Sequence, residues 1–179
     1  METAGAATDI GRMNGYEKTS IAETEEKREN MKIVFEPVTA ENMEDVLKLH
    51  IAGSQKGFVE TVKQCLDEAR EWACWRPVGI YIDGQLVGFA MYCLWEEKSM
   101  EDRVWMDRFL IDERYQGKGY GKACLPVLLD KIQGEYGCDK IYLSVVEENQ
   151  TAIHLYREFG FEFNGESDLH GEKVMVRQN

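Results

Sequence analysis

The chain has 179 residues, of which 44% are hydrophobic and 11% aromatic, and this composition is sufficient for one domain with a sizeable core. Its formal net charge of −12 argues against nucleic acid as a partner, because phosphate contacts require positive charge. No apolar run is long enough to cross a membrane. An acidic surface attracts cationic partners, although simple solubility explains such a surface equally well.

The first thirty residues contain small, polar and charged side chains and almost no large apolar ones. Such a segment cannot bury enough surface to fold, so residues 1–30 are predicted to form a disordered N-terminal extension. Residues 31–179 are predicted to form a single domain without internal repeats.

The cysteine and histidine residues indicate a reducing compartment and no metal site. Five cysteines occur without a Cys-x-x-Cys pair, at positions 65, 74, 93, 124 and 138. This usage is typical of structural thiols, so we expect a cytoplasmic protein. The three histidines are scattered too widely to suggest metal ligands. Cys124 is expected to pack in the core rather than to act as a nucleophile.

The first half of the folded part begins with a predicted strand over 33–38. Thr39 is the predicted N-cap of a helix that runs to about His50, and a second helix is predicted over 58–72. Asp83 and Gly84 then form a tight turn that joins two strands into a hairpin, 79–82 and 85–95.

The second half follows a charged loop over 96–102 and alternates strands and helices. Its predicted elements are a strand over 104–111, a helix from the following glycine turn to about 133, a strand over 140–145, a helix over 151–159, and a final hairpin of 161–164 with 173–177. Pro126 predicts a kink in the long helix or a first turn that begins late. The order indicates a mixed α/β fold with helices on both faces of the sheet.

Three glycines, at positions 117, 119 and 121, join the strand at 104–111 to the long helix. Glycines allow positive φ, so the backbone N–H groups of this turn and the helix N-terminus form a predicted phosphate cradle. The turn is not a Walker loop, because Ala123 stands where Ser or Thr is required. It is not a dinucleotide fingerprint either, because the glycine spacing is one residue too short.

Two motifs together resemble the GNAT superfamily of acyl-CoA-dependent N-acetyltransferases. Gln116, Gly119 and Gly121 satisfy its pattern Gln/Arg-x-x-Gly-x-Gly/Ala, and residues 149–161 match its second signature. The resemblance implies a mostly antiparallel sheet with one splayed parallel strand pair, and acetyl-CoA as the acetyl donor. Glu113 departs from the superfamily, which commonly has proline there.

The resemblance also implies which residues bind acetyl-CoA. They are Phe109, Leu110, Ile111, Gln116, Gly117, Lys118, Gly119, Tyr120, Gly121, Lys122, Asn149, Ala152 and Tyr156. The backbone N–H of Ile111 is the expected donor to the thioester oxygen. Core packing of the strand residues is compatible with this role, and Asn149 is equally plausible as an ordinary helix N-cap.

Tyr156 is the predicted general acid, because a phenol can protonate the departing thiolate. The alternative is a packing aromatic. Asp107 is the predicted general base, placed two residues before Phe109 and therefore on the same strand face; the alternative is an ion pair with Arg108 or Arg103. His154 is expected to be a surface or packing residue.

Stretches at 55–59 and 105–117 resemble a narrower group, the bacterial spermidine and spermine N-acetyltransferases. This resemblance implies a small cationic polyamine as acceptor, held by carboxylates and aromatic rings. The candidate residues are Glu36, Glu60, Tyr92, Trp95 and Asp107. Three alternatives stay open: an aminoglycoside-like antibiotic as acceptor, a protein N-terminal amine as acceptor, and a non-catalytic acyl-CoA-binding module. A homodimer is also left open.

Overall fold

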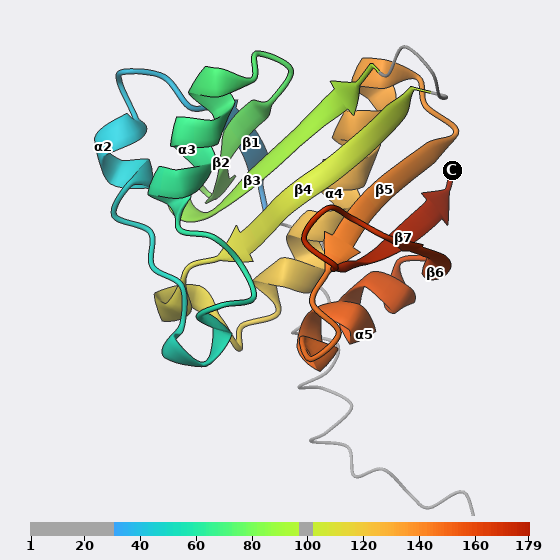
Figure 1. Cartoon of the computed structure of the whole chain (residues 1–179). Helices are drawn as coiled ribbons and strands as arrows, with labels where there is room; N and C mark the ends of the chain where they lie inside the picture. The colour runs from blue at the N-terminus through green and yellow to red at the C-terminus, as the bar shows by residue number, and fades with distance from the viewer. Residues whose placement is uncertain (1–30, 97–101) are drawn as a thin grey trace, which may run out of the picture. The chain divides into compact units, whose positions relative to one another are not determined.

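A computed structural model describes residues 31–96 and 102–179. The predicted extension 1–30 and residues 97–101 of the charged loop lie outside the described residues. A seven-stranded sheet has the order β1-β2-β3-β4-β5-β7-β6 (Figure 1). The strands are β1 (Ile33–Pro37), β2 (Arg76–Ile82), β3 (Gln85–Trp95), β4 (Arg103–Ile111), β5 (Lys140–Val145), β6 (Phe161–Ser167) and β7 (Lys173–Gln178).

Helices cover both faces of this sheet, as predicted. The α-helices are α2 (Met43–Val46), α3 (Val62–Glu71), α4 (Tyr120–Tyr136) and α5 (Gln150–Glu158), and the 3-10 turns are η1 (Gly53–Gln55) and η2 (Glu113–Tyr115). Side chains of α2 and α3 pack with Phe89, Met91 and Cys93 of β3 in one core cluster, whereas α4 lies behind the sheet (Figure 1). No helix of the described part is long and apolar enough to cross a membrane.

The predicted helix over 39–50 is wrong in extent, because only the single turn α2 forms. The N–H of Thr39 donates to Asn42 Oδ1 in a local turn, and Asn42, not Thr39, precedes the helix. The chain then leaves the helical path, because the N–H of His50 donates to the distant side chain of Asp112 at 2.8 Å. A tertiary hydrogen bond thus replaces the next helical one.

Helix α3 begins at Val62, four residues later than predicted. Thr61 Oγ1 accepts from the backbone N–H of Gln64, and the side chain of Gln64 accepts from the N–H of Thr61 at 2.9 Å. This capping box fixes the start of the helix and leaves 58–60 in the preceding loop.

Helix α4 begins at Tyr120, directly after the glycine turn, so the predicted late start is wrong. Pro126 lies inside the continuous helix, where it removes only one intrahelical hydrogen bond. The helix ends at Tyr136, three residues beyond the predicted end, and is capped by Gly137, which has φ +59.

Strands β4 and β5 form a parallel pair that is registered only at Val104 with Ile141 and at Trp105 with Tyr142. From Met106 to Ile111, β4 has no registered partner on this side, so the predicted splayed pair is confirmed. On its other side, β4 pairs with β3, and the register moves from Met91–Arg108 to Tyr92–Met106. Asp107 is therefore the extra residue of a β-bulge.

Candidate active site

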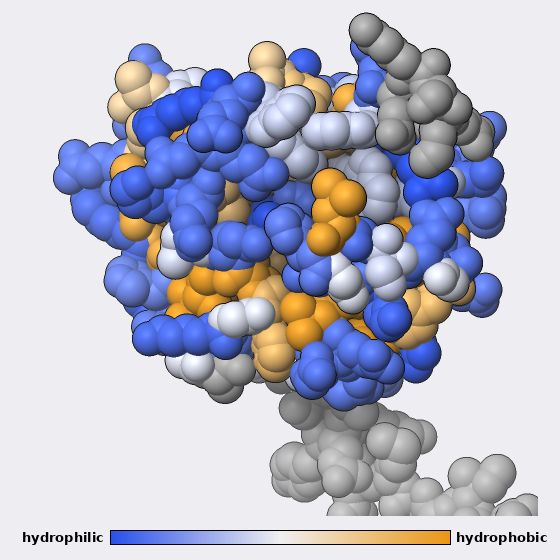
Figure 2. Space-filling model, in the orientation of Figure 1, coloured by the Kyte–Doolittle hydropathy of each residue, from blue (hydrophilic) through white to orange (hydrophobic). Residues whose placement is uncertain are grey.

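A cavity of about 380 Å³ lies where β4 parts from β5, bounded by the glycine loop, the start of α4 and helix α5. On the face seen in Figure 2, hydrophobic residues gather below the middle and are surrounded by hydrophilic ones. Every residue predicted to bind acetyl-CoA lines this cavity except Lys118 and Lys122. Lys122 instead forms an ion pair with Glu158 at 2.9 Å, and Lys118 Nζ lies 5.1 Å from the ring centroid of Tyr115.

The glycine loop uses left-handed backbone at two of its three glycines. Gly117 has φ +73 and Gly119, the N-cap of α4, has φ +78. Gly121 lies inside the helix without positive φ, so that part of the prediction is wrong. A Cβ on Gly121 would project toward Leu155 and Ile111 at 3.7 and 3.9 Å, in the wall of the cavity. Both distances are ordinary van der Waals contacts, so a Cβ at this position would lie against the cavity wall without a clash.

The open edge of β4 presents backbone groups to the same cavity. The N–H of Asp112 donates to Val87 of β3 at 2.9 Å, so strand alternation directs the N–H of Ile111 to the opposite, unpaired edge. The carbonyl oxygen of Ile111 accepts from Gln116 Nε2 at 2.8 Å, and the same nitrogen donates to Gln55 Oε1 at 2.8 Å. The Gln116 side chain therefore links the glycine loop to the end of β4 and to Gln55.

Helix α5 supplies the other wall. Asn149 Oδ1 accepts from the N–H of Ala152 at 3.3 Å, which makes Asn149 the N-cap of the helix as well as a cavity residue. Tyr156 lies two turns further on. Burial, together with the negative charge of Glu172, raises the pKa of Tyr156 to about 12, so its phenol keeps its proton at neutral pH.

Asp107 is largely buried, and its carboxylate forms an ion pair with Arg108. Arg108 Nε also lies 2.8 Å from Glu60 Oε2, and its Nη2 lies 3.6 Å from Glu68 Oε2. Burial raises the pKa of Asp107 to about 6; Arg108 opposes this rise, and Glu68 and Glu60 add to it. Asp107 therefore forms an ion pair with Arg108 and also has a pKa raised toward neutrality.

The bulge at Asp107 lies within the stretch of β4 that carries the predicted base. Phe109 lies toward Gly121 at the start of α4, whereas Asp107 contacts Arg108, whose other partners Glu60 and Glu68 lie on and just before α3. A bulge interrupts strict strand alternation, yet Asp107 and Phe109 both line one narrow pocket.

Asp107 and Tyr156 nevertheless meet at a narrow pocket of about 30 Å³, together with Glu60, Ser144 and Glu172. Sequence patterns gave no indication of Glu172, because it lies in the turn between β6 and β7. Ser144 Oγ donates to Glu172 Oε2 at 3.0 Å.

Three predicted acceptor residues are not brought to this pocket. Glu36 is exposed on β1, opposite Gly79 of β2. Tyr92 is only 2% exposed, and its hydroxyl donates to Glu135 of α4 at 2.7 Å. Trp95 packs against Trp72, with ring centroids 5.6 Å apart.

The cysteines, His154 and a possible metal site were the remaining polar features weighed from the sequence. The five cysteines are free thiols, and burial raises the pKa of Cys124 to about 12. His154 Nε2 lies 3.7 Å from Glu158 on the exposed side of α5. Within 31–96 and 102–179, no group of three or more His, Cys, Asp or Glu residues could hold a metal ion.

Residues 43–161 match the model of the acetyltransferase (GNAT) family, and the chain belongs to this family. It is an acetyl-CoA-dependent N-acetyltransferase. The fold class, the donor and the type of reaction expected from the sequence are thereby confirmed.

Over 151 residues the chain is 49% identical to the spermine/spermidine N(1)-acetyltransferase of Bacillus subtilis strain 168, covering 83% of this chain and 99% of that protein. PaiA N-acetyltransferase from Thermoplasma acidophilum, in complex with coenzyme A, shares the fold with a TM-score of 0.59 at 17% identity, over 83% of this chain and 99% of that one. A chimera containing spermidine N-acetyltransferase SpeG from Vibrio cholerae has a TM-score of 0.61 at 18% identity, over 82% and 94%.

Proposed function

We propose that this enzyme transfers the acetyl group of acetyl-CoA to a primary amine of a small polyamine such as spermidine or spermine. The observation that carries the proposal is the 49% identity with the Bacillus subtilis enzyme over 99% of its length. Carboxylates beside the transfer site support it, because Asp107, Glu60 and Glu172 line one pocket with only Arg108 as a cation among its lining residues.

Acetyl-CoA supplies the acetyl group as a thioester. Asp107 is the proposed base that removes a proton from the bound ammonium, since its pKa of about 6 lets it accept and release protons near neutral pH. The N–H of Ile111 is the proposed donor to the thioester oxygen as negative charge develops there. Tyr156 is the proposed acid that returns a proton to the departing sulfur.

The proposed contacts with acetyl-CoA involve the open edge of β4 and the glycine loop. The open edge of β4 binds the pantetheine arm through backbone groups, and the glycine loop at the start of α4 binds the pyrophosphate. The cavity lined by Gly119, Tyr120 and Gly121 supports this proposal, because the N–H groups of a helix N-terminus favour an anion.

Steady-state kinetics with acetyl-CoA and four acceptors test the proposal: spermidine, spermine, an aminoglycoside and a peptide with a free N-terminus. Spermidine or spermine is expected to have the highest kcat/KM. Turnover of the aminoglycoside or the peptide alone would replace the polyamine with that acceptor class. Binding of acetyl-CoA without turnover of any acceptor would support the non-catalytic module instead.

A cytoplasmic location is also proposed, in keeping with the five free thiols. The homodimer stays a prediction, which light scattering of the purified full chain will test.

A further inference from the structure

We propose that Glu172 makes this enzyme select acceptors that carry a second positive charge, by binding an ammonium group other than the one that is acetylated. The inference rests on the proposed polyamine acetylation and names a specificity-determining residue for it. Glu172 lies in the turn between β6 and β7, far in the sequence from the other residues of the site.

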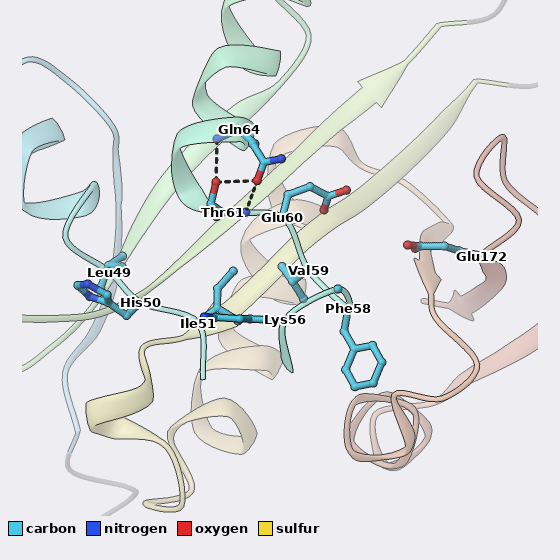
Figure 3. Close-up of a pocket in the computed structure, with 11 residues that line it drawn as sticks. Leu49, His50, Ile51, Lys56, Phe58, Val59, Glu60, Thr61, Gln64 and Glu172 are labelled. Carbon is cyan, nitrogen blue, oxygen red and sulfur yellow. Dashed lines mark hydrogen bonds between the residues drawn. The ribbon is translucent and has the colours of Figure 1, made fainter. Parts of the chain in front are cut away.

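A cavity of about 500 Å³ lies beside the transfer site, between the segment that precedes α3 and the β6–β7 turn (Figure 3). Glu60 and Glu172 stand on its opposite walls, and Figure 3 shows their carboxylates pointing toward each other across the open space. The lining of this cavity is partly apolar, with Ile51, Phe58 and Val59, and Lys56 is the one Lys or Arg among its lining residues. Carboxylates separated by apolar surface match a chain of methylenes between ammonium groups.

The two cavities share two acidic residues, Glu60 and Glu172. Glu60 and Glu172 also line the narrow pocket that contains Asp107 and Tyr156. An acceptor whose reacting nitrogen lies at Asp107 therefore extends past Glu172 into the larger cavity. A polyamine carries its next charged nitrogen along this path, whereas a simple alkylamine does not.

Acidic groups outnumber cations around Glu172, because Glu60 and Asp107 line the same pocket and Arg108 is its one cationic lining residue. Arg108 is already shared by Asp107, Glu60 and Glu68. Within the part of the chain that the structure describes, no Lys or Arg lies close enough to Glu172 for an ion pair, and its carboxylate accepts a hydrogen bond from the neutral Ser144. Burial raises the pKa of Glu172, the charges of Asp168 and Glu60 add to the rise, and the Ser144 hydrogen bond and the charge of Arg108 oppose it. A substrate ammonium relieves this repulsion.

The test replaces Glu172 with its uncharged isostere. Glu172→Gln keeps the size of the side chain and an oxygen for the Ser144 hydroxyl, and removes the charge. The matched control is Glu162→Gln, an exposed position on β6 of the same hairpin. Both variants and the unaltered enzyme are assayed with spermidine and with n-butylamine, a monocation. Thermal unfolding and the KM for acetyl-CoA show whether fold and donor site are intact.

Glu172→Gln is expected to lower kcat/KM for spermidine by about tenfold or more and to change that for butylamine by a much smaller factor, which reflects only the influence of Glu172 on Tyr156. Glu172→Lys is expected to lower kcat/KM for spermidine further. Glu162→Gln is expected to leave kcat/KM for both acceptors unchanged. Added salt should weaken spermidine binding more in the unaltered enzyme than in Glu172→Gln.

Two other results overturn the inference in distinguishable ways. In the first, the enzyme acetylates spermidine while Glu172→Gln changes kcat/KM for both acceptors equally, or for neither. In that case Glu172 does not bind a second ammonium group, and the polyamine function stands. If the unaltered enzyme acetylates no polyamine, the proposed function fails and this inference fails with it.

Discussion

The backbone N–H of His50 donates to the carboxylate of Asp112 across 2.8 Å, although the two residues are 62 positions apart. Asp112 is fully buried and also accepts hydrogen bonds from the backbone and the guanidinium of Arg114. A second link joins the same two segments, because Gln116 donates to Gln55. Residues 50–55, which lead to the proposed acceptor cavity, are thus tied to the glycine loop that is proposed to bind acetyl-CoA.

Replacing Asp112 with Ala is expected to lower the free energy of unfolding by about 2–3 kcal/mol, because the N–H of His50 and the Arg114 side chain lose their acceptor. Urea denaturation measures this. Asp130→Ala, at an exposed position on α4, is the control and should stay within about 0.5 kcal/mol. Equal losses in both variants would contradict a special role for Asp112.

The lowered pKa of Asp112 predicts that the free energy of unfolding falls in acid. Burial opposes ionisation, but hydrogen bonds from Arg114 and His50 lower the pKa of Asp112 to about 2, below the value of about 4 for an unfolded chain. Its contribution is therefore complete above pH 4 and is lost as the pH falls toward 2. In Asp112→Asn, the free energy of unfolding should fall less steeply over this window; an unchanged slope would contradict the assignment.

The pH dependence of activity tests Asp107. With a pKa of about 6, the base is protonated and inactive at lower pH, so kcat should rise as the pH passes through about 6. Asp107→Asn should lower kcat and remove this inflection. Glu68→Gln is the sharper test: Glu68 raises the pKa of Asp107, so its loss should move the inflection to lower pH. An inflection that persists in Asp107→Asn would exclude Asp107 as the base.

Tyr156→Phe is expected to reduce kcat about 100-fold and to leave the KM for acetyl-CoA nearly unchanged, because only the donated proton is lost. The pKa of about 12 implies that Tyr156 causes no loss of activity between pH 7 and pH 9 in the unaltered enzyme. Tyr81→Phe, on β2, is the control. A Tyr156→Phe enzyme with full turnover would leave Tyr156 as a packing residue.

Gly119→Ala is expected to weaken acetyl-CoA binding about tenfold, because Gly119 has φ +78 and alanine strains this backbone conformation. Isothermal titration of acetyl-CoA measures the change. Gly134→Ala, inside the same helix with nothing near its Cβ position, should leave binding unchanged and stabilise the protein by about 0.5–1 kcal/mol. Similar effects on binding in both variants would exclude a local role for the loop.

Local patterns in the sequence predicted the elements that depend on nearby residues. The Asp83-Gly84 turn has positive φ at both residues, as a two-residue type I′ hairpin turn requires. The strand over 140–145 has the predicted bounds. The predicted helix over 39–50 failed because a tertiary hydrogen bond to Asp112 competes with helical ones, and no local pattern reports such a partner.

The sequence by itself determined the donor half of the enzyme, since the glycine loop and the Asn149–Tyr156 helix are short, contiguous signals whose backbone geometry is local. Only the tertiary structure shows which of the residues proposed for the acceptor half lie together. Asp107 lies at a bulge and forms an ion pair with Arg108, Tyr92 is buried against α4, and Glu172 lines the Asp107 pocket from the β6–β7 hairpin. Such relationships depend on strand register and on loops that meet across the sheet, which the order of residues along the chain does not display.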